Sequence, residues 1–330
     1  MTVKLWDVVI AGAGPAGLSA ALVLGRARRR VLLCDTGTPR SWAAKEMHGF
    51  LTRDGVPPAE FRRLAHKELA RYPSVEFRAV EVTAATRNVD GHFSVTLGKR
   101  RRVRSRKLLI ATGVFDHLPT LDGIEQFFGT SVFQCPYCHG WEMRDAPIAV
   151  YGKRRRGFEM ARAMTAWSNN VVLCTDGAAR LSDAEKTHLQ RNGIPVIEER
   201  IERLQGSRGK LREIVFRGGH RLKRTALFFD TPSSSQSQLA EALGCQFARH
   251  GGIKCGQHEA TSVPGVFVAG NIIKDVQLVI VAAAEGTRAA FGINRALTRE
   301  DFERRATGSR RIQHPALEDP DMQRRRRKHA

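Results

Sequence analysis

The sequence has few cysteines, a shortage of acidic residues and no long uninterrupted apolar run. Six cysteines in 330 residues are too few for a scaffold held by disulfides. Glycines and a proline interrupt the apolar stretch at residues 8–25, so it does not predict a membrane-spanning helix. No export signal precedes the first predicted strand, and we therefore expect a cytoplasmic protein without a membrane partner.

The shortage of acids leaves 54 Lys and Arg against 33 Asp and Glu, a formal charge of +21. Such a charge raises the question of a nucleic-acid partner. The basic residues are spread along the chain, however, and their local runs at Lys99–Arg102, Lys153–Arg156 and Arg324–Lys328 are not interleaved with aromatics. No helix-turn-helix, zinc-finger or RNA-recognition pattern is present, so a general basic bias is favoured over a nucleic-acid surface.

An internal repeat predicts the architecture. Val8–Gly17 (VVIAGAGPAG) resembles Ile148–Gly157 (IAVYGKRRRG) at an offset of 140 residues, and the same offset carries Val31–Cys34 onto Val171–Cys174. Each copy has the pattern of strand, glycine turn, helix and strand, which is a βαβ unit. Two such units in a chain of this length predict an α/β fold with two Rossmann-like, doubly wound domains.

The first copy has every feature of a dinucleotide-binding loop. Gly12-x-Gly14-x-x-Gly17 follows a strand and opens a helix. Gly12 would permit the tight turn, Gly14 the approach of a pyrophosphate, and Gly17 the packing of helix on strand. Asp35 ends the second strand, where an acid would bind a ribose hydroxyl. This copy is therefore predicted to bind a dinucleotide.

The second copy is altered. Arg154 stands where the second glycine should be, between Gly152 and Gly157, and Asp176 lies near the ribose position. An arginine side chain would block the approach of a pyrophosphate, or its guanidinium would itself bind phosphate. Asp176 would repel a 2′-phosphate. Both interpretations stay open, and the use of NAD(P)H at this degenerate loop is uncertain from sequence.

Two further strand-and-turn segments, Leu108–Gly113 and Val266–Asn271, are assigned to the first domain, and a helix is expected over Asp275–Leu297. The second domain would then be inserted in the first. The expected boundaries are 1–116 and 244–302 for the first domain, 117–243 for the second, and a basic, disordered tail at 303–330.

The segment Cys135-Pro136-Tyr137-Cys138-His139 carries the sharpest chemical signal. Two cysteines spaced in this way can form a redox-active disulfide, and a histidine titrating near neutrality could move the proton. Haem attachment would require export, and zinc would require further ligands at a suitable spacing. A redox pair is therefore favoured over haem, zinc or two structural cysteines, and no metal ligand is assigned.

The glycine loop, the inserted second unit and the Cys-x-x-Cys at its head together resemble the low-molecular-weight thioredoxin reductases over Asp7–Leu297. The stretch Cys135–Glu142 (CPYCHGWE) is similar to the branch that includes the flavin dithiol oxidases of gliotoxin- and holomycin-type products. The resemblance implies FAD, a thioredoxin-like or small-molecule disulfide partner, and a homodimer. Cys138 would face the flavin, Cys135 would attack the substrate, and His139 stands where these reductases usually carry an aspartate.

The resemblance also implies the residues that contact the cofactor. They comprise the first glycine loop with its ribose acid, an Ala-Thr-Gly turn and the segment before the last helix. These residues are Gly12, Gly14, Pro15, Ala16, Gly17, Asp35, Ala111, Thr112, Gly113, Gly270, Asn271, Gln277 and Leu278. Family members usually end the C-terminal strand in Gly-Asp, and the amide of Asn271 can still bind a ribityl hydroxyl.

Three functions follow from these patterns. The first is an FAD-dependent disulfide reductase that draws electrons from NAD(P)H. The second is a dithiol oxidase, in which a substrate dithiol reduces the cysteine pair and oxygen accepts the electrons; the altered loop at Gly152–Gly157 favours it. The third is a basic protein that uses a flavin fold to bind nucleic acid. Reductase-like chemistry is slightly favoured, and the direction of electron flow stays open.

Overall fold

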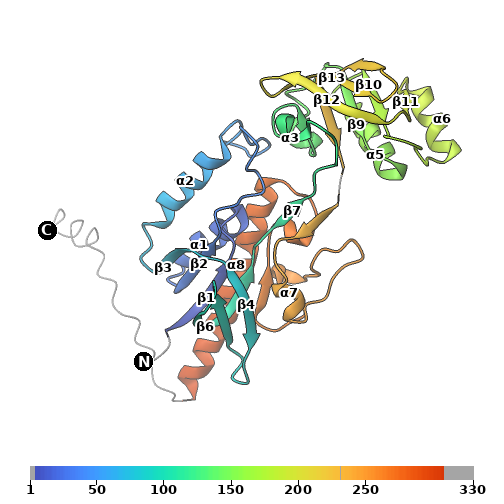
Figure 1. The fold of residues 1–330 in the computed structure, drawn as a ribbon. Helices are drawn as coiled ribbons and strands as arrows, with labels where there is room; N and C mark the ends of the chain where they lie inside the picture. The colour runs from blue at the N-terminus through green and yellow to red at the C-terminus, as the bar shows by residue number, and fades with distance from the viewer. Residues whose placement is uncertain (1–3, 231, 308–330) are drawn as a thin grey trace, which may run out of the picture.

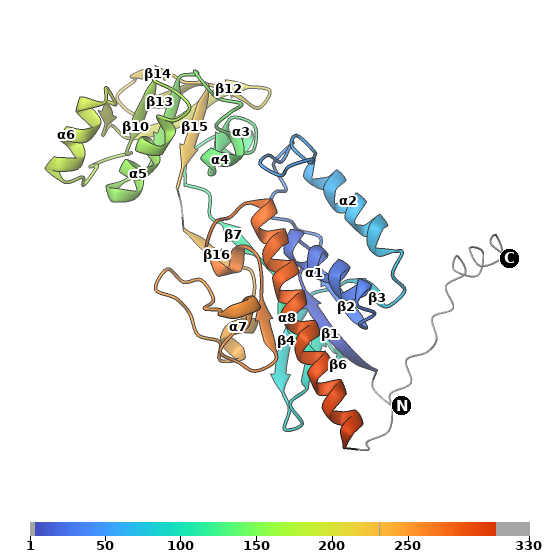
Figure 2. The same cartoon turned by 180° about the vertical axis from the view of Figure 1, so that it is seen from behind.

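The computed structural model describes residues 4–230 and 232–307. Figures 1 and 2 show two lobes joined by a narrow connection, one containing both the first strands and the last helix, the other containing the middle of the chain. This is the predicted α/β architecture, with one Rossmann-like domain inserted in another. No helix of the described residues is long and apolar enough to cross a membrane.

The first domain is built on a mixed sheet. Its strands are β1 (Leu5–Ala11), β2 (Val31–Asp35), β3 (Val75–Ala79), β4 (Val82–Arg87), β5 (Phe93–Leu97), β6 (Arg101–Ile110) and β17 (Val266–Val268). The order is β3-β2-β1-β6-β5-β4, and β17 runs parallel to the end of β6. The central strands β1 and β2 are mostly apolar, with one aspartate each, and nearly all of their residues are buried because both faces of the sheet are covered.

Three helices flank this sheet: α1 (Pro15–Arg26), α2 (Pro58–Leu69) and the long α8 (Val279–Ala306). A side chain on Gly286 of α8 would lie 2.0 Å from the backbone oxygen of Ala16, so α8 crosses α1 in backbone contact. At its other end, the guanidinium of Arg29 bonds Asn294, Thr298 and Asp301. Helix α8 extends past the expected end at Leu297 to Ala306.

The second domain has a parallel sheet of β8 (Val132–Phe133), β9 (Ile148–Tyr151), β10 (Val171–Cys174), β11 (Val196–Ile197) and β15 (Ala226–Phe229), in the order β11-β10-β9-β15-β8. The helices are α3 (Ile124–Phe127), α4 (Pro136–His139), α5 (Arg154–Met164) and α6 (Asp183–Arg191). An antiparallel sheet of β12 (Ile201–Ser207), β13 (Lys210–Phe216) and β14 (Arg221–Lys223) covers one side.

The predicted repeat is present in three dimensions. In the first domain β1 and β2 pair so that Val8 lies beside Val31, and in the second β9 and β10 pair so that Ile148 lies beside Val171. These are the same two positions of the repeat at the same offset. The sequence similarity therefore reflects one βαβ unit built twice with one register.

The chain enters and leaves the second domain side by side. Strand β7 (Val114–Asp116) on the way in pairs antiparallel with β16 (Ser233–Ser235) on the way out. Helix α7 (Leu239–Ala242) follows, and Leu239 packs in the core of the first domain. The return thus precedes the expected boundary at 243, and short 3₁₀ turns, Gln257–Glu259 and Asn271–Ile273, lie in the resumed part. The tail was expected from residue 303, but residues 303–306 belong to α8, and from 308 onward it lies outside the described residues.

Candidate functional site

A cavity of about 1020 Å³ lies between the first domain and the cysteine-bearing segment of the second. Its volume is at the upper end of the range for ligand pockets. The structure brings all but one of the predicted site residues to its wall, including both cysteines and His139. Gly17 is the exception: a side chain there would lie 1.9 Å from the backbone oxygen of Gly12, so this glycine serves the turn and not the cavity.

The first glycine loop leaves space where a ligand would approach. Gly12 has a φ of +103°, and a side chain on it would collide with the backbone of Ala111. At Gly14 an added Cβ would meet no protein atom within 4 Å, although the residue lines the cavity. Helix α1 starts directly afterwards at Pro15 with unpaired N–H groups, which favour an anion. The loop therefore fits a pyrophosphate.

Asp35 reaches the cavity from the end of β2. Its carboxylate accepts hydrogen bonds from the backbone N–H groups of Ala13 (3.0 Å) and Gly37 (3.1 Å). It also pairs with Arg62 of α2 at 2.8 Å. These contacts fix the carboxylate beside the glycine loop, at the place predicted for a ribose hydroxyl.

The turn Ala111–Gly113 faces the loop from β6. The hydroxyl oxygen of Thr112 is buried and has no hydrogen-bond partner in the structure, although it lines the cavity. Gly113 has a φ of +72° with open space beside it. An orphaned hydroxyl next to a glycine with free space indicates that a polar ligand completes this wall, as FAD would.

The next part of the wall is the turn after β17, which lies beside the turn that follows β6. Gly270 has a φ of +84°, and its N–H donates to the carboxylate of Glu285 on α8 at 2.7 Å. Burial raises the pKa of Glu285 to about 7, against the smaller opposing effect of the Gly270 N–H. Asn271 and Leu278 line the cavity as predicted.

Gln277 also lines the cavity, and its side-chain oxygen accepts a hydrogen bond from Arg40 at 2.5 Å. The same guanidinium binds both carboxylate oxygens of Asp116 in β7, at 2.5 and 2.7 Å. Asp116 in turn accepts from the amide of Gln134, the residue before Cys135. This Arg40 network therefore ties the flavin side of the cavity to the interdomain strand and to the cysteine pair.

Cys135 and Cys138 form a disulfide at the cavity wall. Cys135 caps α4, and its sulfur accepts the N–H of Cys138 at 3.1 Å. Such a bond favours the thiolate when the pair is reduced. Because the two sulfurs are bonded to each other, the structure favours a redox pair over haem attachment or a zinc site at these cysteines.

His139 differs from expectation in its protonation. Burial, with a smaller contribution from the charge of His48, lowers the pKa of His139 to about 4. The ring stacks on Phe133 at 4.4 Å between centroids. The prediction that this imidazole titrates near neutrality is therefore wrong, because burial costs the charged form its hydration. At neutral pH His139 is an uncharged base beside the cysteines.

The second glycine loop keeps its turn but changes its chemistry. A side chain on Gly152 would lie 2.8 Å from Gly157, so the close turn survives. Arg154 opens α5 with a φ of +54°. A separate cavity beside it is lined by Lys153, Arg154, Gly177, Ala178, Arg180 and Arg200. The sequence shows the basic run Lys153–Arg156, and the fold adds Arg180 and Arg200 from later in the chain.

The carboxylate of Asp176, which was expected to repel a phosphate, accepts the backbone N–H of Ile201 at 2.9 Å. Asp176 is not part of the wall of the basic cavity. Its backbone oxygen accepts from Lys153. The acid therefore serves the local fold of β12 and the loop.

The remaining cysteines are thiols. Cys34 and Cys174 lie in buried strands, and burial raises the pKa of each to about 12. Both thiols therefore stay protonated and unreactive at neutral pH.

Comparisons with known proteins agree with this geometry. Residues 6–286 match the family described as pyridine nucleotide-disulphide oxidoreductase. The "Probable thioredoxin reductase" of Arthroderma benhamiae is 30% identical over 325 residues, which cover 88% of this chain and 78% of that protein.

Two solved structures extend the comparison. The crystal structure of HlmI has a TM-score of 0.89 and 35% identity, covering 92% of this chain and 96% of that one. The crystal structure of a putative thioredoxin reductase TrxB from Bacillus anthracis has a TM-score of 0.84 and 34% identity, and the match covers 89% of this chain and 99% of that one.

Proposed function

The chain belongs to the pyridine nucleotide-disulphide oxidoreductases and is a thioredoxin reductase-like flavoprotein. We propose that it carries electrons from NADPH through FAD and the Cys135–Cys138 disulfide to an external disulfide. One observation carries the proposal: the disulfide and the first glycine loop line the same cavity. A redox pair and a flavin site in one cavity can exchange electrons without a mobile carrier. A basic protein without enzymatic chemistry would not need this juxtaposition.

Residues of the first domain that line the cavity would hold FAD. The loop at Gly12–Ala16 would bind the pyrophosphate, Asp35 the ribose, and the orphaned Thr112 hydroxyl a polar group of the cofactor. When bound, FAD supplies two-electron exchange with a disulfide. By the resemblance, Cys138 would lie on the flavin side and Cys135 on the substrate side.

His139 would act as the general base and acid for the cysteine pair. Reduction of the disulfide by two electrons and one proton leaves one thiol and one thiolate. The N–H of Cys138 stabilises charge on the Cys135 sulfur, which suits a nucleophile that attacks a substrate disulfide. His139, uncharged at neutral pH, would accept the proton of the Cys138 thiol as that thiol attacks the mixed disulfide at Cys135, and would return the proton to the leaving substrate thiolate.

The basic cavity of the second domain supports NADPH as donor. Lys153, Arg154, Arg180 and Arg200 supply positive charge at the start of α5, where a nucleotide phosphate would bind. A phosphate dianion is the group that such a cluster prefers. The partner would be a thioredoxin-like protein or a small-molecule disulfide, and we propose a homodimer as the assembly.

A second candidate is a dithiol oxidase, and one observation favours it. Arg154 stands where the first loop has Gly14, so a dinucleotide cannot approach the second loop as closely through its backbone. If no nicotinamide binds, electrons would enter from a substrate dithiol at Cys135–Cys138 and leave to oxygen.

The deciding experiment mixes the purified yellow protein anaerobically with NADPH, with NADH or with a dithiol, while flavin absorbance is followed. Rapid bleaching by NADPH is expected. Bleaching by the dithiol but by neither nucleotide would replace the reductase with the oxidase.

The role of the disulfide is tested by Cys138→Ser. We expect disulfide turnover to fall by at least about a thousandfold while the protein stays yellow, because the hydroxyl cannot form the disulfide. Cys255→Ser, a partly buried thiol away from the cavity wall, is the matched control and should turn over normally. Turnover retained in Cys138→Ser would remove the pair from the mechanism.

A further inference from the structure

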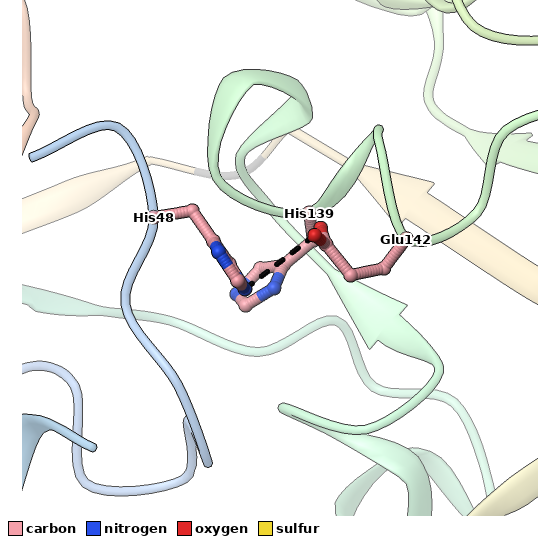
Figure 3. Close-up of side chains that lie close together, drawn as sticks. All are labelled: His48, His139 and Glu142. Atoms are coloured by element: carbon pink, nitrogen blue, oxygen red, sulfur yellow. Dashed lines mark ion pairs between the residues drawn. The ribbon is translucent and has the colours of Figure 1, made fainter. Parts of the chain in front are cut away.

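Three potential metal ligands converge between the domains beside the cysteine pair. His48 comes from the segment between β2 and α2, His139 ends α4, and Glu142 lies in the turn that follows (Figure 3). One ligand atom from each lies within 4.8 Å of the other two. The Nε2 atom of His48 is 3.5 Å from a carboxylate oxygen of Glu142.

His48 and Glu142 form an ion pair (Figure 3) that lacks the geometry of a hydrogen bond. A separation of 3.5 Å is longer than an ordinary N–H···O hydrogen bond, which is about 2.7–3.2 Å. Among the described residues, no hydrogen bond uses a ring nitrogen of His48 or His139. Two ligands of one tetrahedral zinc ion, each about 2.0–2.1 Å from the metal, lie about 3.3 Å apart. The spacing of His48 and Glu142 is therefore closer to that of two ligands sharing a cation than to a direct bond.

The ligand types of His48, His139 and Glu142 indicate which metal ion would bind. Two imidazoles and one carboxylate, with the remaining position open, form a ligand set that binds Zn²⁺. Imidazole favours late transition metals over Mg²⁺ or Ca²⁺. Glu46 and Asp54 lie 3.7 and 3.6 Å from the His48 ring, so the site is locally acidic in a strongly basic protein.

We propose that His48, His139 and Glu142 form a binding site for a divalent transition-metal ion, with Zn²⁺ as the preferred occupant. The site goes beyond the oxidoreductase function. Because His48 belongs to the first domain and the other two ligands to the second, a bound ion ties the domains together. It holds the Cys135–Cys138 segment against the flavin cavity, where the pair cannot move away to meet a large substrate.

Zinc binding is measured on the tag-free, oxidised flavoprotein, in which Cys135 and Cys138 are joined and offer no thiolate. Equilibrium dialysis against Zn²⁺, with elemental analysis of zinc per protein, should give one tightly bound ion per chain. His48→Ala and the milder Glu142→Gln should each weaken binding at least tenfold. His220→Ala is the matched control, because that exposed imidazole pairs with Glu199 at 3.4 Å and should keep wild-type binding.

X-ray absorption at the zinc edge identifies the ligands independently of affinity. Nitrogen and oxygen scatterers without sulfur are expected. Wild-type binding no tighter than that of His48→Ala and Glu142→Gln would overturn the proposal, as would sulfur among the ligands. Flavin content and circular dichroism verify that each variant is folded, and none of these readouts depends on NADPH or on the disulfide substrate.

Discussion

The two βαβ units of this chain share one backbone plan and differ in how they meet a phosphate. Both keep the close glycine contact of the turn, Gly12 with Gly17 and Gly152 with Gly157. In the first unit, helix α1 begins at Pro15, and Gly14 before it has empty space where a side chain would be. In the second, the equivalent position is Arg154, and the surroundings are basic.

The difference separates folding from binding. The glycines that are kept in both units are those whose side chains would strike backbone, because without them the strand, turn and helix cannot pack. Gly14 is needed only for a ligand, so the second unit could lose its equivalent and keep the fold. In the proposed function, the first unit would bind its anion with backbone N–H groups, whereas the second would offer guanidinium and ammonium groups.

The largest effect is expected from giving the first loop a side chain at Gly14. Gly14→Val should lower the FAD content of the purified protein more than tenfold, because the branched side chain fills the space left for the pyrophosphate. Arg154→Val, the same change at the equivalent position, is the matched control and should remain yellow. The ratio of flavin to protein absorbance measures both. Full flavin content in Gly14→Val would refute the loop assignment.

A smaller effect tests the side-chain mode of the second loop. Arg180→Gln or Arg200→Gln should raise the KM for NADPH by about tenfold, the scale of one lost charge-assisted hydrogen bond. Arg221→Gln, which removes an arginine paired with Glu213 elsewhere in the domain, should leave KM unchanged. Steady-state kinetics over NADPH concentration measure the effect. An unchanged KM in both variants would mean that the basic cavity does not bind the donor.

The smallest effect concerns Glu285, a half-buried acid on α8 that has no counterpart among the residues lining the basic cavity. The folded-state pKa of Glu285, about 7, lies above its ordinary value of 4.5. The folded protein therefore holds this proton more tightly, and the resulting stability is complete below pH 4.5 and lost as pH rises through 7.

Glu285→Gln removes this titration while keeping an oxygen that can accept from Gly270. The Tm of the variant should equal that of the wild type near pH 4. At pH 8 the Tm of the variant should exceed the wild-type Tm by a few degrees, because ionisation of Glu285 lowers the free energy of unfolding of the wild type by about 1–3 kcal/mol. Glu303→Gln, on an exposed part of the same helix, is the control. Thermal unfolding across this pH range is the measurement, and a constant difference between the variant and the wild type would contradict the assignment.

What the sequence predicted well was local. The glycine loop, Asp35, the turn at Ala111–Gly113 and the cysteine pair each lie within a few residues of a recognisable strand or helix. The register of the repeat was also predictable, since Val8 and Val31 recur at a constant offset as Ile148 and Val171. Such features depend on neighbours in the chain.

What it missed depends on long-range contacts. The pairing of Arg40 with Asp116 and Gln277 joins segments from opposite ends of the chain. His48 and Glu142 have no pattern in common that would pair them. The lowered pKa of His139 follows from its burial against Phe133. The early return of the chain to the first domain follows from the packing of Leu239 in the core of that domain. The spacing of residues along the sequence predicts neither feature.

The pairing of β7 with β16 has a consequence for how such a chain can be assembled from parts. Val114 lies beside Ser235 and Asp116 beside Ser233, so the second domain begins and ends at neighbouring points. A short turn could close that gap without disturbing the order of the first sheet. The inserted domain could therefore be exchanged for another domain whose ends lie close together. The first domain would then carry a different electron-donor site or a different pair of redox cysteines, attached through the same two strands.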